Sequence, residues 1–442
     1  MEIPGNNLKV MIVGSGGREH ALAWKLALSP FVERIYCAPG NGGTYGANKT
    51  RNIDITAMDF GGITRFCQEE KIDLVVVGPD NPIAEGLVDV LQLSGVRVFG
   101  PTQQAARLES SKVFAKEFMA AHHLPTARYA VCNSLAQGMD LVAEHPWARV
   151  IKVDGLALGK GVFVCDSQDE AQEALLAIFK EKRFGQAGQQ VVIEERLAGE
   201  ELSLLLFCDG KTIVPMPACQ DHKRRFDGDR GPNTGGMGAY SPVALWQVCH
   251  EEIEEQILSP VRKALQTGQL SYQGVLYIGL MVVTRQLEEN VRAYQPYVLE
   301  FNARFGDPEA QALLPLMQTD LLRVLWACTE GKLHEVEINW LEQASCCVVA
   351  VADCYPQSSS SGQPIAVGNM PDEKTVVFHS GSRFDGTKLV TSGGRILSVT
   401  AIAPDMEAAV AKAYAGMKGI SFAGMDYRLD IARRALTGCL SA

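Results

Sequence analysis

Short apolar segments alternate with amphipathic segments through the first hundred residues, and this alternation constrains the fold more than any other feature of the sequence. The apolar segments include LKVMIVG from Leu8, IDLVVVG ending at Gly78 and VRVFG ending at Gly100. Strands that are apolar throughout are typical of parallel sheets covered by helices on both faces. The sequence therefore predicts an N-terminal α/β domain with a parallel sheet, spanning residues 1–103.

Three glycine-rich loops follow the strands of this domain, at residues 14–17, 39–43 and 78–82. Ligands of parallel sheets bind beyond the carboxyl ends of the strands, and the first loop opens into a helix whose N-terminal amides can bind an anion. A phosphate monoester would suit these loops. A nicotinamide dinucleotide is disfavoured, because Glu19 replaces the third glycine of GxGxxG and Ala38 stands where an acidic residue should meet a ribose.

The rest of the chain differs in character from this domain. Long strands and helices between about residues 104 and 330 indicate an α+β core, and short strands with turn-rich connections after Gly331 indicate a small β-rich domain. Within the core, RRFDGDRGPNTGGMGAYSP is too polar for an interior segment. A long loop of this kind inside a compact domain is either disordered or functional.

The bulk composition excludes several classes of partner. The formal net charge is −10, which argues against a nucleic acid or an anionic membrane as partner, since both require a basic surface. The 12 cysteines form no CxxC pair and lie in apolar segments, as expected in a reducing compartment. There is no signal-like N-terminus and no run of eighteen apolar residues, so we expect a cytoplasmic protein.

The stretch IKVDGLALGKG, residues 151–161, is rich in glycine and lysine but is not a P-loop. Gly155 and Gly159 are separated by three residues instead of four, and Gly161 stands where a hydroxyl residue should coordinate magnesium. The glycines still allow backbone amides to face an anion, and Lys152 and Lys160 add positive charge. A glycine-rich hairpin with solvated lysines is the alternative interpretation.

The stretch YVLEFNARFGDPEAQ carries two further candidate sites. Strand alternation places Glu300 and Asn302 on one face, where their oxygens can share a magnesium ion completed by nucleotide phosphates. A cross-strand hydrogen-bonding pair is the alternative. Arg304 and Asp307 follow at the turn into a helix, where they could hold the carboxylate and the ammonium of an amino acid, or instead form an internal salt bridge.

Taken together and in this order, several motifs resemble the phosphoribosylamine–glycine ligase (glycinamide ribonucleotide synthetase) family of the ATP-grasp superfamily. They are GSGGREHALAW, APGNGGT, IKVDGLALGKG, VVIEERLAGEELS, QDHKR, GPNTGGMGAYSP and NARFGDPEAQ. The resemblance extends from Leu8 to Arg434. It implies ATP-dependent ligation of glycine to 5-phosphoribosylamine through glycyl phosphate, giving glycinamide ribonucleotide, ADP and phosphate in de novo purine synthesis.

The resemblance also implies the organisation of the core and its nucleotide site. The large lobe would comprise residues 104–123 and 194–330, the small lobe residues 124–193, and the C-terminal β-rich domain residues 331–442. ATP would bind between the lobes with Mg²⁺ or Mn²⁺. Its phosphates would contact Lys112, Lys152 and a glycine loop with Gly155, Gly159 and Gly161. Its adenine would contact the hinge residues Glu194, Glu195 and Leu197, and its ribose would contact Glu201.

The remaining site residues follow from the same resemblance. Glu300 and Asn302 match the metal ligands, and the catalytic residues would be Lys152, Lys223, Arg304 and Asp307. The two substrates would contact Gly16, Gly17, Asn41, Gly42, Asp80, Asp221, Asn233, Gly236, Arg304 and Asp307. Asp80 departs from the Gly-Pro-Glu of many members, and position 279, acidic in many ATP-grasp enzymes, is Gly.

Two alternatives stay open. One is another ATP-grasp carboxylate–amine ligase or a carboxylase, against which the GPNTGGMG and RFGDPE motifs count. The other is a non-catalytic nucleotide-binding module, which should have lost a lysine or the Glu-x-Asn pair. In either case we expect small-molecule ligands only, no nucleic acid, no membrane and a monomer.

Overall fold

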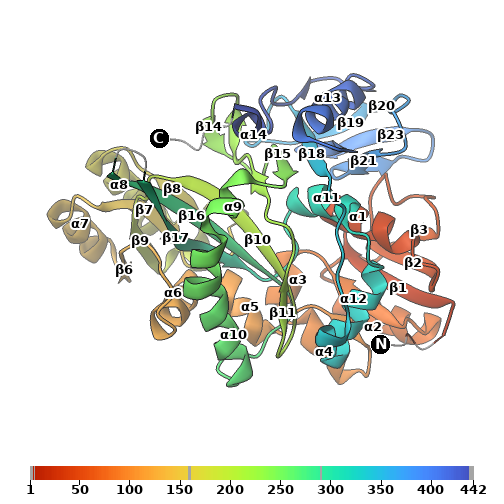
Figure 1. Ribbon diagram of the computed structural model, residues 1–442, viewed down its shortest axis with the longest axis horizontal. Helices are drawn as coiled ribbons and strands as arrows, with labels where there is room; N and C mark the ends of the chain where they lie inside the picture. The colour runs from red at the N-terminus through yellow and green to blue at the C-terminus, as the bar shows by residue number, and fades with distance from the viewer. Residues whose placement is uncertain (1–2, 4, 158–160, 289–290, 438–442) are drawn as a thin grey trace.

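The computed structural model describes residues 3, 5–157, 161–288 and 291–437, and its N-terminal domain is a five-stranded parallel sheet in the order β3-β2-β1-β4-β5 (Figure 1). Strand β1 lies in the middle of this sheet and most of its residues are buried, which accounts for its continuous apolar sequence. The strands are β1 (Leu8–Gly14), β2 (Val32–Pro39), β3 (Thr50–Asn52), β4 (Leu74–Val77) and β5 (Val98–Phe99), and the helices are α1 (Gly17–Ala27), α2 (Phe60–Glu70), α3 (Asp80–Ala84) and α4 (Leu87–Leu93).

The segment between β4 and β5 forms two helices, α3 and α4. They are separated by Glu85 and Gly86, and Gly86 has a φ of 89°, a left-handed conformation that glycine adopts without a steric penalty. Helix α3 begins at Asp80, within the third predicted glycine-rich loop.

The small lobe is a separate layer with its own core, at the left of Figure 1. Its antiparallel sheet has the order β6-β9-β7-β8, and α7 and α8 pack on it. The elements are β6 (Tyr129–Cys132), α7 (Leu135–Glu144), β7 (Ala148–Val153), β8 (Val162–Val164), α8 (Gln168–Leu175), a π-helical turn (Leu176–Lys180), a 3-10 turn (Gly185–Gly188) and β9 (Val191–Glu195).

The large lobe is built on the antiparallel sheet β11-β10-β16-β17. Helix α12 packs on β5, β10 and β16, and so joins this lobe to the N-terminal domain through a common core. The strands are β10 (Glu200–Asp209), β11 (Ile213–Pro215), β16 (Gln273–Glu288) and β17 (Val291–Asn302), and the helices are α5 (Gln103–Ser110), α6 (Lys112–Ala121), α9 (Ala244–Ile253), α10 (Ser259–Gln266), α11 (Glu309–Leu313) and α12 (Leu321–Glu330). A π-helical turn (Glu254–Leu258) joins α9 to α10, and 3-10 turns cover Leu314–Leu316 and Leu333–Glu335.

The C-terminal domain is a small antiparallel β structure, drawn in blue at the upper right of Figure 1. Its main sheet has the order β12-β15-β18-β24-β21, with β26 beside β18, and α13 packs on β18 and β24. The elements are β18 (Ala344–Ala352), β19 (Ser360–Pro364), β20 (Ala366–Val367), β21 (Thr375–His379), β22 (Ser382–Phe384), β23 (Leu389–Gly393), β24 (Arg395–Ala403), α13 (Met406–Met417), β25 (Ile420–Ser421), β26 (Met425–Asp426) and α14 (Arg433–Thr437).

The polar segment between residues 220 and 241, predicted as a long loop, contains four short strands. β12 (Gln220–Asp221) and β15 (Gly238–Ser241) join the C-terminal sheet, and β13 (Arg224–Phe226) and β14 (Arg230–Asn233) form a hairpin between them. For β15 no local pattern could have indicated a strand, because its partner β18 lies about a hundred residues further along the chain. The predicted fold class is confirmed: a parallel-sheet domain, a two-lobed core and a small β-rich domain.

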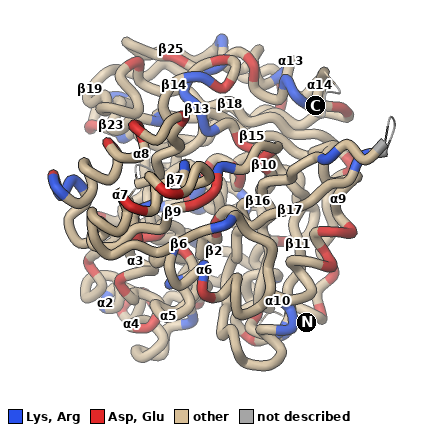
Figure 2. Tube along the Cα trace, turned by 90° about the vertical axis from the view of Figure 1, so that its left-hand side faces the viewer, with Lys and Arg blue, Asp and Glu red and all other residues tan. Residues whose placement is uncertain are grey.

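None of the helices within the described ranges has the length and apolar character needed to cross a membrane. Figure 2 shows acidic and basic residues interspersed across the molecule in that view.

Candidate active site

A cavity of about 410 Å³ lies where the N-terminal domain, both lobes and the C-terminal domain meet. Helix α6, strands β7, β9 and β17, and the turn that follows β17 all contribute side chains to it. The size suits a small-molecule site. Its lining includes these predicted residues: Asp80, Lys112, Lys152, Gly155, Gly161, Glu194, Asp221, Lys223, Glu300, Asn302, Arg304 and Asp307.

Three lysines converge on the part of the cavity that the small lobe covers. Lys152 on β7 donates a hydrogen bond to the Leu299 carbonyl at 3.1 Å and lies 2.9 Å from Glu194 on β9. Lys116, one helical turn after Lys112, lies 3.3 Å from the same Glu194 oxygen. Burial lowers the pKa of Lys116 to about 8, although Glu194 opposes this effect. Two ammonium groups therefore share one carboxylate.

Lys112 also faces the glycine-rich stretch of the small lobe. Its ammonium donates to the Gly155 carbonyl at 3.0 Å, and burial lowers the pKa of Lys112. Gly155 has a φ of 157°, and a Cβ there would lie 2.7 Å from the Cβ of Ala187, so the close approach requires glycine. Gly161 also lines the cavity, whereas the predicted Gly159 and its neighbour Lys160 lie outside the described residues.

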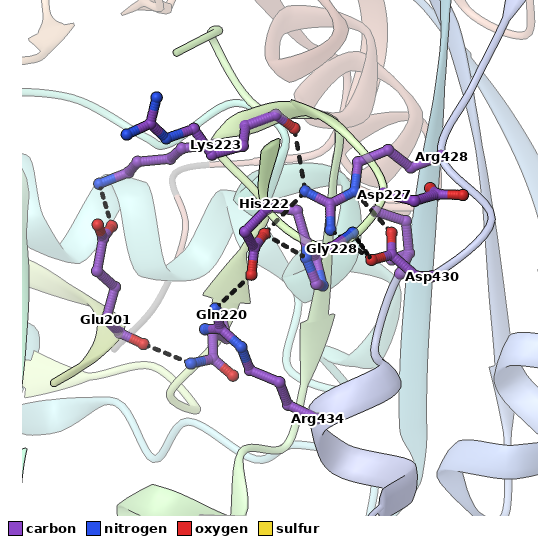
Figure 3. Close-up of polar contacts among 12 residues, drawn as sticks. Glu201, Gln220, His222, Lys223, Asp227, Gly228, Arg428, Asp430 and Arg434 are labelled. Carbon is purple, nitrogen blue, oxygen red and sulfur yellow. Dashed lines mark hydrogen bonds and ion pairs between the residues drawn. The ribbon is translucent and has the colours of Figure 1, made fainter. Parts of the chain in front are cut away.

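Lys223, which also lines the cavity, bridges two carboxylates. Its ammonium lies 2.7 Å from Glu201 and 3.9 Å from Glu300, and Figure 3 shows the Glu201 contact. Burial disfavours its charged form, but Glu201 and Asp221 outweigh burial and hold the pKa of Lys223 well above its usual value. Burial raises the pKa of the neighbouring Asp221 to about 8, although Lys223 opposes the rise.

Strand β17 supplies Glu300 and Asn302 to the cavity. Burial tends to raise the pKa of Glu300, but the cations Lys223, Lys152, Lys112 and Arg304 outweigh it, so the pKa is lowered. Glu300 is paired in register with Gly279 on β16, where a Cβ would lie 3.1 Å from the Glu300 Cγ. The glycine at 279 therefore leaves room for the Glu300 side chain.

The turn after β17 holds Arg304 and Asp307, and each has a different partner. Arg304 lies 2.9 Å from Glu109, whose other oxygen accepts the Ala303 amide at 2.7 Å. Asp307 lies 3.3 Å from Arg395 of the C-terminal domain and accepts a hydrogen bond from Gln311 at 2.7 Å. Both residues line the cavity while taking part in internal ion pairs.

A second cavity, of about 810 Å³, lies between the N-terminal glycine loops and the C-terminal domain. Asp307, Tyr355 and Arg395 line both cavities. Arg395 donates to the carbonyls of Gly235 and Asp307, and the Tyr355 hydroxyl accepts the Gly235 amide at 2.8 Å. The wall between the two cavities is thus assembled from the large lobe and the C-terminal domain.

The predicted loop residues of the N-terminal domain fall at different places. Gly16 and Asn41 line the second cavity. The Gly16 amide donates to Glu19 at 2.6 Å, so a protein carboxylate already occupies this amide of the loop. Asn41 donates to the His379 carbonyl at 2.7 Å and so ties this loop to the C-terminal domain. A Cβ on Gly17 would lie 2.3 Å from the Gln311 amide nitrogen, which makes Gly17 a close-packing position.

The other predicted residues with described positions lie outside the lining of these two cavities: Gly17, Gly42, Glu195, Leu197, Glu201, Asn233 and Gly236. The sequence interpretation missed other lining residues, among them Arg18, Glu109, Lys116, Tyr277, Tyr355 and Arg395. Only Lys116 carried a usable signal, because it follows Lys112 by four residues on a predicted helix.

The two-lobed core, with lysines and the Glu-x-Asn strand lining one cavity, defines an ATP-grasp protein. A solved structure of the same fold is the biotin carboxylase domain of the 2-oxoglutarate carboxylase of Hydrogenobacter thermophilus. It has a TM-score of 0.67 and 14% identity, and the match covers 98% of this chain and 93% of that one. At this identity the likeness shows the fold.

Sequence comparison defines the family within this fold. Models of the phosphoribosylglycinamide synthetase N domain, ATP-grasp domain and C domain match residues 8–109, 110–310 and 345–434. The phosphoribosylamine–glycine ligases of Ralstonia nicotianae and Synechocystis are each 44% identical to this chain over 97% of its length and all of theirs. The crystal structure of the Thermotoga maritima phosphoribosylamine–glycine ligase has a TM-score of 0.78 and 32% identity, covering 96% of this chain and all of that one. The chain belongs to the phosphoribosylglycinamide synthetase family, and it is an ATP-grasp ligase of purine synthesis.

Proposed function

We propose that this chain joins glycine to 5-phosphoribosylamine through glycyl phosphate, with ATP as the source of the phosphoryl group. The observation that carries the proposal is the convergence of Lys112, Lys152 and Lys223 on one cavity that also contains Glu300 and Asn302. This arrangement provides cations for a polyphosphate and hard oxygen ligands for a metal ion in one place. The extent of identity to ligases of this activity supports the choice of substrates.

ATP would lie in the first cavity between the lobes. Lys112 and Lys152 would bind its phosphates, with the Gly155–Gly161 stretch above them, and the apolar side chains of Ala115, Val162 and Leu299 would pack on the adenine. The hinge residues Glu195 and Leu197 at the end of β9 would offer backbone groups to the adenine edge. Glu201, proposed as the ribose-hydroxyl acceptor, pairs with Lys223 in this structure, so ribose binding would share that carboxylate.

Glu300 and Asn302 would hold Mg²⁺ or Mn²⁺ together with phosphate oxygens. The lowered pKa of Glu300 fits this role, since a metal ligand must be ionised. Among the residues that the structure describes, His, Cys, Asp and Glu form no group of three or more that could bind a metal. The nucleotide would therefore have to supply several ligands, as is usual for magnesium. The metal supplies charge neutralisation on the transferred phosphoryl group.

The reaction needs no nucleophile from the protein. The carboxylate of glycine attacks the γ-phosphorus of ATP and ADP leaves, while Lys152 and Lys223 stabilise the charge on the phosphoryl oxygens. The amine of phosphoribosylamine then attacks the acyl carbon of glycyl phosphate, and phosphate leaves with the amide bond formed. Water has to be excluded, because it would hydrolyse the acyl phosphate.

The two amine-bearing substrates would occupy the neighbouring cavities. Glycine fits the junction at Arg304 and Asp307, where a cation and an ionised carboxylate line the same cavity as Lys223. Phosphoribosylamine fits the second cavity, with Gly16, Asn41 and Arg395 on its walls. Asp80, Asp221, Asn233 and Gly236 stay proposed substrate contacts. We further propose that the chain acts as a cytoplasmic monomer.

The test is ADP release with magnesium–ATP, glycine and phosphoribosylamine generated in the assay, with each substrate omitted in turn. Release that requires both glycine and phosphoribosylamine supports the proposal. Release with a different carboxylate or amine acceptor would retain the ATP-grasp chemistry and contradict the substrates. No release under any condition would favour a nucleotide-binding module.

A further inference from the structure

The hairpin formed by β13 and β14 is fastened to residues 426–434 by a group of charged side chains (Figure 3). Arg428 is 2% exposed, and its guanidinium binds Asp430 through two hydrogen bonds of 2.7 Å. The same guanidinium donates to the Arg224 carbonyl at 3.0 Å and to the Asp229 carboxylate at 2.9 Å. Arg224 begins β13 and Asp229 precedes β14, so one side chain holds both arms of the hairpin.

Further contacts fasten the turn of the hairpin to the same segment. Arg434 donates to Asp229 at 2.6 Å, the Gly228 amide donates to Asp430 at 2.8 Å, and the Leu429 amide donates to Asp227 at 2.9 Å. These bonds join the hairpin to residues about two hundred positions later in the sequence, so the C-terminal domain fixes the position of the hairpin.

Lys223 lies directly between two residues that this segment holds. On one side the His222 imidazole accepts the Ala432 amide at 3.1 Å, and on the other side the Arg224 carbonyl accepts Arg428. The Lys223 carbonyl itself accepts the amide and the hydroxyl of Thr234, each at 2.8 Å. Hydrogen bonds at His222, Lys223 and Arg224 therefore fix the backbone on both sides of the Lys223 side chain.

A fixed backbone matters at this position because a lysine side chain is long and flexible. Lys223 has four rotatable methylene groups, and its ammonium must lie 2.7 Å from Glu201 while staying near Glu300. A charged group stabilises a transition state most when its supporting residues hold it in place beforehand. Displacement of β13 would move the ammonium away from both carboxylates.

We propose that Arg428 is a positioning residue for Lys223: through the β13–β14 hairpin, it holds the Lys223 ammonium beside the site of phosphoryl transfer. This inference rests on the proposed role of Lys223 in the reaction. It assigns to the C-terminal domain a function in the first chemical step, although Arg428 itself does not line the cavity.

The first test is a double-mutant cycle with Arg428→Gln and Lys223→Met. A control is Lys412→Gln, which removes a partly exposed ion-paired cation of the same domain, the partner of Asp372. We expect Arg428→Gln to lower kcat about tenfold while the KM values for ATP and glycine change by less than about threefold. In the Lys223→Met background the same substitution should cost less than about twofold, since the two residues act as a unit. Equal losses in both backgrounds would overturn the proposal.

The second test reads the position of Lys223 without activity. Acetic anhydride labelling of Lys223, followed by mass spectrometry, should become several-fold faster in Arg428→Gln and in the milder Asp229→Asn, because a lysine side chain that no longer contacts Glu201 is more accessible to the reagent. Lys412→Gln should label at the wild-type rate. A wild-type rate in both hairpin variants would overturn the proposal. A third outcome is faster labelling of Lys223 in Arg428→Gln and Asp229→Asn while Lys223→Met keeps normal turnover. That result would uphold the positioning role of Arg428 and contradict the proposed role of Lys223 in the reaction.

Discussion

Lys152 and Glu194 lie 2.9 Å apart, and both side chains are less than a tenth exposed. Lys116 approaches the same Glu194 oxygen at 3.3 Å, so the carboxylate neutralises only one of two buried cations. The excess positive charge faces the cavity proposed for ATP, where it would be balanced by phosphate oxygens. A single glutamate thus keeps two lysines ordered while leaving charge available for the nucleotide.

Substitution of Lys152 tests the use of that charge. We expect Lys152→Met to lower kcat by about a hundredfold to a thousandfold, as removal of a single preorganised charge-stabilising group often does. The measurement is steady-state ADP formation at saturating substrates. Lys180→Met, an exposed cation of the same lobe, is the control and should retain wild-type turnover. A Lys152→Met variant as active as this control would contradict the phosphate-binding role.

Glu300→Gln tests the metal site. The amide keeps the size of the side chain but removes the charge that a divalent ion needs, so we expect kcat to fall by about a hundredfold or more and the magnesium requirement to rise. The measurement is a magnesium titration of turnover, with the exposed Glu373→Gln as control. Wild-type turnover at ordinary magnesium concentrations would remove Glu300 from the metal site.

Arg395→Gln tests the wall shared by the two cavities. Its loss would free the carbonyls of Gly235 and Asp307 and leave the Asp307 carboxylate with a weaker set of partners. We expect the KM for phosphoribosylamine to rise about tenfold or more, and the KM for ATP to change less. The reason is that Arg395 lines the cavity proposed for phosphoribosylamine, where its charge-assisted hydrogen bonds hold the wall in place. Equal effects on all three substrates would indicate a purely structural role.

The interface between the N-terminal and C-terminal domains should weaken at acidic pH. Burial, together with the nearby His379, lowers the pKa of His20 to about 3, and burial lowers the pKa of His379 to about 4. The His20 imidazole accepts the His379 amide at 2.8 Å and so must stay neutral. In the unfolded chain these two imidazoles bind protons below about pH 6.5, whereas in the folded chain they stay neutral down to about pH 4. The free energy of unfolding therefore falls as the pH decreases from about 6.5 toward 4.

Urea unfolding at pH 7 and pH 5 measures this effect. The wild type should lose on the order of 2 kcal/mol per imidazole between these values. His20→Gln, which keeps an acceptor but does not titrate, should lose correspondingly less. An identical pH dependence in both proteins would show that His20 does not contribute.

The sequence predicted the parts of the structure that depend on nearby residues. The apolar runs of β1 and β4 fixed the parallel sheet, and the spacing of Glu300 and Asn302 placed both on the wall of one cavity. The position of Arg395 could not be predicted, because it meets Gly235 across 160 residues of chain. Nothing in a single sequence specifies such a pairing, whereas strand and helix periodicity is local.

The strand β15 lies between β12 and β18, so the C-terminal sheet takes two of its strands from the middle of the chain. The family models for the ATP-grasp and C domains end and begin at residues 310 and 345, but no cut between those positions would yield two complete sheets. A C-terminal fragment would expose the β18 edge that β15 covers, and exposed edges promote aggregation. The residue ranges that the family models match are therefore not units that can each complete their sheets alone, and only the two fragments together could restore the C-terminal sheet.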